Sequence, residues 1–173
     1  MSYDNELGCY RSGPVSVPLV GGQHSILVKL DDDDPAPKDF GAAIRQFLML
    51  DPSVLVDTAP AVFSYYRDIS AAVLADGDDD WYIEIPTVGE VFDHVRLGEE
   101  PAILVERDDT RGGRVYVSLE YECEWEPEHG LQVVLRDGLT VTKVGPYDGH
   151  LTNAAAFDDD RLDGVVYVHR HMP

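Results

Sequence analysis

The chain of 173 residues has little cysteine, little lysine and no long apolar segment. Its two cysteines, Cys9 and Cys123, lie far apart, which excludes a disulfide framework and the paired thiols of a zinc ribbon. No apolar run approaches the ~20 residues that a membrane-spanning helix needs. The N-terminus also lacks the basic start and apolar core of a signal peptide. We therefore expect a soluble, cytoplasmic protein that does not enter a membrane.

Positive charge is scarce, whereas carboxylates are abundant. Thirteen Lys and Arg residues stand against 33 Asp and Glu residues, which gives a formal net charge of −20. Such a chain should repel the phosphates of nucleic acids and anionic membranes, and it can attract a basic protein or cations. The same acidity also keeps a protein soluble or reflects a salt-adapted host, so a structural domain that is acidic for these reasons alone is one alternative.

Helical periodicity occupies much of the first half of the chain. Apolar residues recur at helical spacing over residues 38–51 and again from Thr58 to the region of Gly77. Thr58 is expected to cap the second helix, with Pro60 in its first turn. The sequence therefore predicts two amphipathic helices.

A third, short helix is predicted after Thr87, where Thr87 and Glu90 have the spacing of a capping box. Gly98 is expected to end it in a left-handed conformation. The chain up to this point also contains three short segments typical of strands, over residues 15–20, 26–30 and 81–85.

The second half of the chain is mostly typical of strands, over residues 102–106, 115–125, 131–136, 139–144 and 165–168. A two-residue turn at Asp137-Gly138 should place Arg136 opposite Leu139. The order of the elements predicts a single acidic α+β domain over residues 1–173. In it, an antiparallel meander in the C-terminal half is covered by two or three N-terminal helices.

Residues 115–125 alternate between two faces, as a half-buried strand requires. One face carries the apolar side chains of Val115, Val117, Leu119, Tyr121, Cys123 and Trp125. The other ends in a row of four carboxylates, roughly 6.5–7 Å apart along the strand, formed by Glu120, Glu122, Glu124 and Glu126. This row, called the acidic row below, predicts a surface that docks a basic partner or cations. Alternatively it is a solvated face paired with Arg114, Arg136 or Lys143.

Two loops at the same end of the predicted sheet carry metal-ligating side chains. The first, over residues 123–131, concentrates a thiol, an indole, carboxylates and an imidazole, and the second carries Asp148 and His150. A divalent metal held by Glu128, His129, Asp148 and His150 is one hypothesis. The alternative is that His129 only orders its turn. Cys123 is not expected to be a nucleophile, because the alternation places it on the apolar face.

The segment from Cys123 to Leu131 resembles a family of uncharacterised bacterial domains. In that family a Cys-x-Trp-x-x-Glu-His-Gly-Leu segment precedes a strand and an Asp-Gly hairpin follows. The resemblance implies the same arrangement of strands and supplies no activity. At the level of the fold alone, small acidic α+β domains of this kind are also similar to immunity proteins of bacterial toxin systems.

The sequence thus favours a non-enzymatic binding or regulatory domain, immunity-like, that docks a basic protein. It contains no P-loop, serine elbow or glycine-rich phosphate loop, and no cofactor is predicted. The residues expected to bind the partner are Glu120, Glu122, Glu124, Trp125, Glu126 and His129. A metal-dependent or small-ligand enzyme with its site at the edge formed by His129 and His150 is the second alternative.

Overall fold

The computed structural model describes residues 1–77, 82–99, 101–108 and 112–169. Its largest sheet runs in the order β1-β2-β5-β7-β8-β9-β10, and β6 pairs with β8 beside this path. These strands are β1 (Ser2–Asp4), β2 (Cys9–Arg11), β5 (Leu27–Lys29), β6 (Val95–Leu97), β7 (Ile103–Asp108), β8 (Arg114–Cys123), β9 (Leu131–Arg136) and β10 (Thr140–Gly145). A second, two-stranded sheet is formed by β3 (Val15–Ser16) and β4 (Gln23–His24).

The sheet is mostly antiparallel and the α+β class is confirmed. Strands β7 to β10 are consecutive in the chain and each is antiparallel to the next. Strand β5 runs parallel to β7 and brings the N-terminal strands into the same sheet. The sequence assigned no strand to residues 1–12, because β1 and β2 have three residues each and are too short to show a period.

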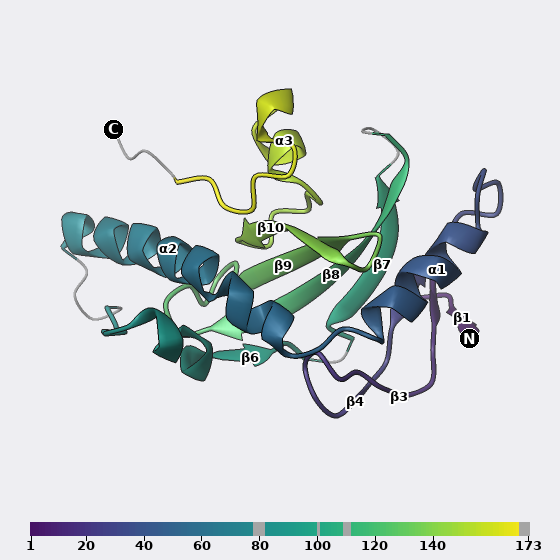
Figure 1. The fold of residues 1–173 in the computed structure, drawn as a ribbon, viewed down its shortest axis with the longest axis horizontal. Coiled ribbons are helices and arrows are strands. Elements are labelled where there is room, and N and C mark those ends of the chain that lie inside the picture. Colours follow the sequence, from purple (N-terminus) through teal and green to yellow (C-terminus); the bar gives the residue numbers. More distant parts are fainter. Residues whose placement is uncertain (78–81, 100, 109–111, 170–173) are drawn as a thin grey trace.

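Two helices lie on one face of the sheet, which we call the inner face. They are α1 (Lys38–Phe47) and α2 (Ser53–Asp76), and in Figure 1 they pass in front of the strands, whereas α3 (Asn153–Ala156) stands beyond β10. The predicted apolar face of residues 115–125 is confirmed, since all six of its side chains are buried in the main core.

The opposite, outer face of β8 is only partly exposed. Tyr116 and Ser118 are buried there, and Tyr116 packs in a small apolar cluster with Val134 and Leu151. The C-terminal segment therefore covers the first half of the outer face. The prediction of a half-buried strand holds only for the end of β8 that carries the acidic row.

The start of the second helix differs from the prediction. Helix α2 begins at Ser53, and the Thr58 hydroxyl donates to the carbonyls of Val54 at 2.9 Å and Leu55 at 2.7 Å within the helix. Thr58 as the cap is therefore wrong, and Pro60 lies inside the helix, where its missing N–H removes one backbone hydrogen bond. The predicted end is right, since Gly77 caps the helix with φ 75°.

The short helix after Thr87 is a 3-10 helix, η2 (Val88–His94), and its predicted capping box between Thr87 and Glu90 is present. Gly98 does not end this helix, because β6 intervenes. Its N–H instead donates to the Glu120 carbonyl at 2.8 Å, and a Cβ at this position would lie 3.1 Å from the same oxygen. The prediction for Gly98 is thus wrong.

Two predicted strands are not formed. Residues 82–85 are not paired in a sheet, and Trp81 lies outside the described residues. The Tyr66 hydroxyl instead donates to the Ile83 carbonyl and accepts from the Ile85 N–H, both at 3.0 Å. Residues 165–168 also form no regular strand, although the Val144 N–H donates to the Val166 carbonyl at 2.6 Å.

The turn between β9 and β10 has the predicted left-handed residues but a different register. Asp137 and Gly138 have φ 53° and 68°. Thr140, not Leu139, lies opposite Arg136, and a bulge between Val141 and Lys143 then places Lys143 opposite Val134. A third loop residue and the bulge together shift the register by two, which leaves the predicted faces unchanged.

The loop 31–34 is fixed by an ion pair that the sequence did not indicate. The Arg107 guanidinium donates to both carboxylate oxygens of Asp34, at 2.7 and 3.0 Å, and both side chains are buried. These hydrogen bonds lower the pKa of Asp34. The same guanidinium lies 5.2 Å from the centroid of the Phe40 ring, so it attaches both the loop and α1 to β7.

No helix of the described residues is long and apolar enough to span a bilayer.

Candidate functional site

The acidic row crosses from a half-buried to an exposed environment. Glu120 is half-buried, and its backbone pairs with both Gly98 and Ala102 where the edge passes from β6 to β7. Burial raises the pKa of its carboxyl, and the nearby Glu106 carboxylate raises it further. Within the described part of the chain Glu120 has no ion-pair partner. The row thus begins with a carboxylate that lacks a cation.

The middle of the row is exposed and faces β6. The side chains of Glu122 and Glu124 are 46% and 61% exposed. Arg96 pairs with Glu122, and the Nδ1 atom of His94 lies 2.8 Å from a carboxylate oxygen of Glu124. These partners differ from the Arg114, Arg136 and Lys143 considered in the sequence. The sequence missed them because residues 88–98 were expected to form one helix, whereas β6 pairs Arg96 directly with Glu122.

A groove of about 290 Å³ lies along this pairing. Its lining includes Asp93, His94, Arg96, Glu122 and Glu124. Three carboxylates thus border the groove together with one guanidinium and one imidazole. Such a hollow can receive a cationic side chain, which would compete with Arg96 and His94 for the same carboxylates.

Cys123 and Trp125 lie behind the row, in the core. Burial raises the pKa of the Cys123 thiol to about 12, so the thiol carries no nucleophilic charge near neutral pH. The Trp125 ring packs edge-on against Tyr65 and Tyr66, with centroids 6.3 and 5.8 Å apart. Both side chains therefore hold the end of β8 against α2 and are not accessible to a partner.

The last member of the row, Glu126, belongs to the turn before β9. One of its carboxylate oxygens lies 3.3 Å from both the backbone nitrogen and Nδ1 of His129. Glu128 completes a group in which the three ligand atoms lie within 4.8 Å of one another. Gly130 then takes φ 57° against the Tyr121 carbonyl, where a Cβ would approach to 2.4 Å. The last position of the turn therefore requires glycine.

The loop that carries the other half of the predicted metal set joins this turn through a backbone hydrogen bond. The Tyr147 N–H donates to the His129 carbonyl at 3.0 Å, so the two loops do lie at the same edge. Asp148 and His150 are not part of the group formed by Glu126, Glu128 and His129. The Asp148 carboxylate instead pairs with Lys143 and accepts the His150 N–H at 3.0 Å.

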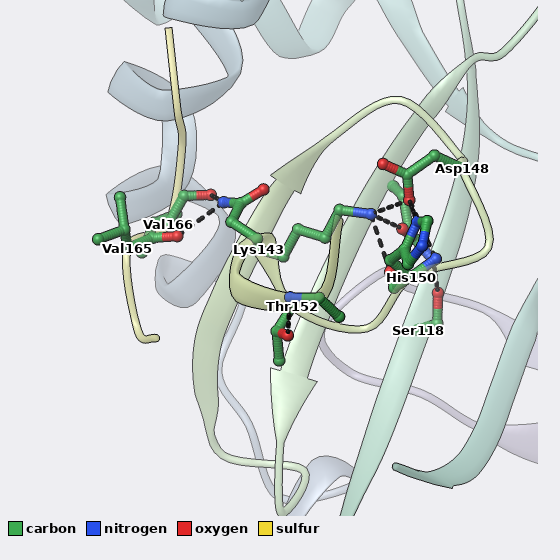
Figure 2. A network of polar contacts seen from close by, with 10 residues as sticks. Ser118, Lys143, Asp148, His150, Thr152, Val165 and Val166 are labelled. Carbon is green, nitrogen blue, oxygen red and sulfur yellow. Dashed lines mark hydrogen bonds and ion pairs between the residues drawn. The ribbon is translucent and has the colours of Figure 1, made fainter. Parts of the chain in front are cut away.

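Figure 2 shows the buried network around Lys143, whose side chain is 1% exposed. Its ammonium group donates to the Asp148 carboxylate, to the Gln132 side-chain oxygen at 2.8 Å and to the His150 carbonyl at 2.8 Å. The Gln132 amide donates in turn to Ser118 at 2.8 Å. With three acceptors the ammonium has no donor left for a substrate. The network therefore fixes loop 146–150 on the outer face.

The comparisons with known proteins identify one family. The model described as "Domain of unknown function (DUF6985)" matches residues 1–151 of this chain. No curated protein and no solved structure matches it. The matched range includes the acidic row, the His129 turn and the Lys143 network up to Leu151.

Proposed function

The chain belongs to the DUF6985 family, and we propose that it is a non-enzymatic, immunity-like binding domain that docks a basic protein through the acidic row. The observation that carries this proposal is the exposed stretch of the row at the groove beside β6. There, Glu122 at the end of β8 and Glu124 in the turn that follows present carboxylates to solvent. A basic side chain entering the groove would exchange with the exposed Arg96, whose surface ion pair costs little to break.

A binding role fits the chemistry of the groups around the row better than catalysis does. The Cys123 thiol is buried and protonated near neutral pH. The Lys143 ammonium is fully hydrogen-bonded. The net charge of −20 adds a long-range attraction for a basic partner, which accelerates its association at low salt.

The experiment compares two double variants that remove the same charge. Glu122→Gln with Glu124→Gln changes the row, and Asp57→Asn with Asp76→Asn changes exposed positions of α2. Binding of a polylysine peptide is measured by calorimetry at several salt concentrations. The proposal predicts that the row variant weakens binding about ten-fold at low salt, that the α2 variant changes it little, and that salt reduces the difference. Equal losses in both variants would show that acidity alone attracts the peptide.

A second candidate is cation binding at the His129 turn. The close approach of Glu126, Glu128 and His129 favours it, because two carboxylates and an imidazole suit a divalent transition metal. Melting with and without added Mn²⁺ or Zn²⁺ tests it, since a bound ion raises the melting temperature. A rise that persists in the His129→Ala variant would exclude this turn as the site.

A further inference from the structure

A cavity of about 570 Å³ lies on the outer face, away from the acidic row. Its volume falls in the range of small-molecule sites. Strands β8 and β9 form one side, where Tyr116 and Arg136 are directly opposite each other and Arg114 lies two residues before Tyr116 on the same face. The segment after β10 forms the other side with Thr152, Asp160 and Asp163.

Two hydroxyl groups line this cavity and can donate hydrogen bonds to a ligand. Tyr116 is 2% exposed as a residue and lines the cavity, and no described residue forms a hydrogen bond with its hydroxyl. The buried Thr152 hydroxyl accepts the Ala155 N–H at 3.1 Å, which leaves its own proton free to donate. Both hydroxyls can therefore donate to a ligand in the cavity.

Two guanidinium groups converge on the same cavity in a chain with only thirteen basic residues. The Nη1 atom of Arg136 lies 3.8 Å from a carboxylate oxygen of Asp163, which is longer than a hydrogen bond. The Arg136 guanidinium therefore donates no hydrogen bond to that carboxylate. Arg114 is hydrogen-bonded to Asp137 at 3.0 Å on its exposed side. Arg136 is therefore the better placed of the two to bind a ligand.

We propose that this cavity binds a small ligand through an oxyanion, either a phosphate or a carboxylate. Arg136 is the main contact, Arg114 is the second cation, and the hydroxyls of Tyr116 and Thr152 donate to the remaining oxygens. All four groups can donate hydrogen bonds, which an oxyanion requires, and the two guanidinium groups repel a cation. The site lies apart from the acidic row, and it does not depend on the proposed docking function.

Asp160 and Asp163 give the cavity a second chemical preference. They lie on the side opposite the strands and repel any part of the ligand that is negative. The rest of the ligand should therefore carry no negative charge on this side of the cavity. Asp163 also competes with the oxyanion for Arg136, which predicts that neutralising it strengthens anion binding.

The test follows amide chemical shifts of the full chain during titration with sodium phosphate and, separately, with sodium acetate at constant ionic strength. A saturable shift with phosphate alone identifies a phosphate site, and one with acetate alone identifies a carboxylate site. Arg136→Gln should weaken binding of the preferred anion by about ten-fold or more and Tyr116→Phe by about three- to ten-fold. Asp163→Asn should strengthen it several-fold.

The matched control is Arg161→Gln, which removes an exposed arginine paired with Asp159 and should leave binding unchanged. Melting curves confirm that each variant is folded. Two results would overturn the proposal. One is the absence of a saturable shift with either anion. The other is equal affinity of the Arg136→Gln and Arg161→Gln variants, which would mean that the anion binds elsewhere.

Discussion

Replacing Lys143 by Met retains most of the side-chain volume and removes its charge and its hydrogen-bond donors. In the folded chain the Asp148 carboxylate, the Gln132 oxygen and the His150 carbonyl would all lose the donor they share. Removing one partner of a buried ion pair costs about 3–5 kcal/mol, because the other charge stays unpaired. Asp148 is partly exposed, so we expect a loss of about 3 kcal/mol. In a chain of this size that lowers the melting temperature by about 6–12 °C.

Urea unfolding of the full chain, followed by circular dichroism, measures this loss. Adding Asp148→Asn to the Lys143→Met variant should recover part of it, because no carboxylate is then left without its cation. A loss below about 1 kcal/mol would place the pair among exposed ion pairs and refute the reasoning.

The same variant has a defined pH dependence. Burial opposes ionisation of Asp148, but the hydrogen bond and charge of Lys143 outweigh it and lower the pKa of that carboxyl. A lowered pKa in the folded chain contributes stability above the unfolded-state pKa, and this contribution disappears as the pH falls through the folded-state value. The effect of Lys143→Met should therefore be largest near neutral pH and shrink in acid.

Three further predictions concern the core and the row. The folded chain should react with iodoacetamide at Cys123 only slowly at pH 8, because burial raises the thiol pKa to about 12. Labelling is measured by mass spectrometry, and rapid labelling of Cys123 would contradict this prediction. Gly138→Ala should destabilise the chain by at least about 2 kcal/mol, because the new Cβ would lie 2.1 Å from the Ala43 carbonyl. Gly149→Ala is the control, with positive φ but free space, and should cost about 1 kcal/mol in the same urea experiment. Glu120→Gln should stabilise the chain at pH 7. The pKa of the Glu120 carboxyl is raised in the folded chain, so its ionisation lowers the free energy of unfolding. The gain from the substitution should vanish below about pH 4, where the carboxyl is protonated in both states.

The sequence predicted those parts of the fold whose causes are local. The alternation along β8, the capping box at Thr87, and the left-handed pair Asp137-Gly138 all follow from neighbouring residues, and all are present. Strands β1 and β2 and the start of α2 were missed, because β2 forms by pairing with β5 and Pro60 is tolerated inside a packed helix. Contacts between residues far apart in the sequence determine where these elements form.

The sequence predicted which carboxylates form the candidate site, but only part of how they are arranged and paired. Glu120 and Glu122 lie on the face of β8 where the alternation placed them, whereas Glu124 and Glu126 lie after the strand has ended. The row's partner Arg96 comes from β6 and its partner His94 from the end of η2, whereas the sequence predicted one helix over both elements. The sequence predicts Lys143 as a surface partner of the row. The bulge before it turns it into the buried centre of the outer-face network instead.

Mapping the docking surface by NMR tests the central claim most directly. The full chain is titrated with a polylysine peptide at low salt, and the amide shifts are assigned along the chain. The docking account predicts that the largest shifts fall on β6 and on the end of β8, around Arg96, Glu122 and Glu124. Shifts spread over the aspartate-rich loops and α2, with none concentrated at β6, would contradict it.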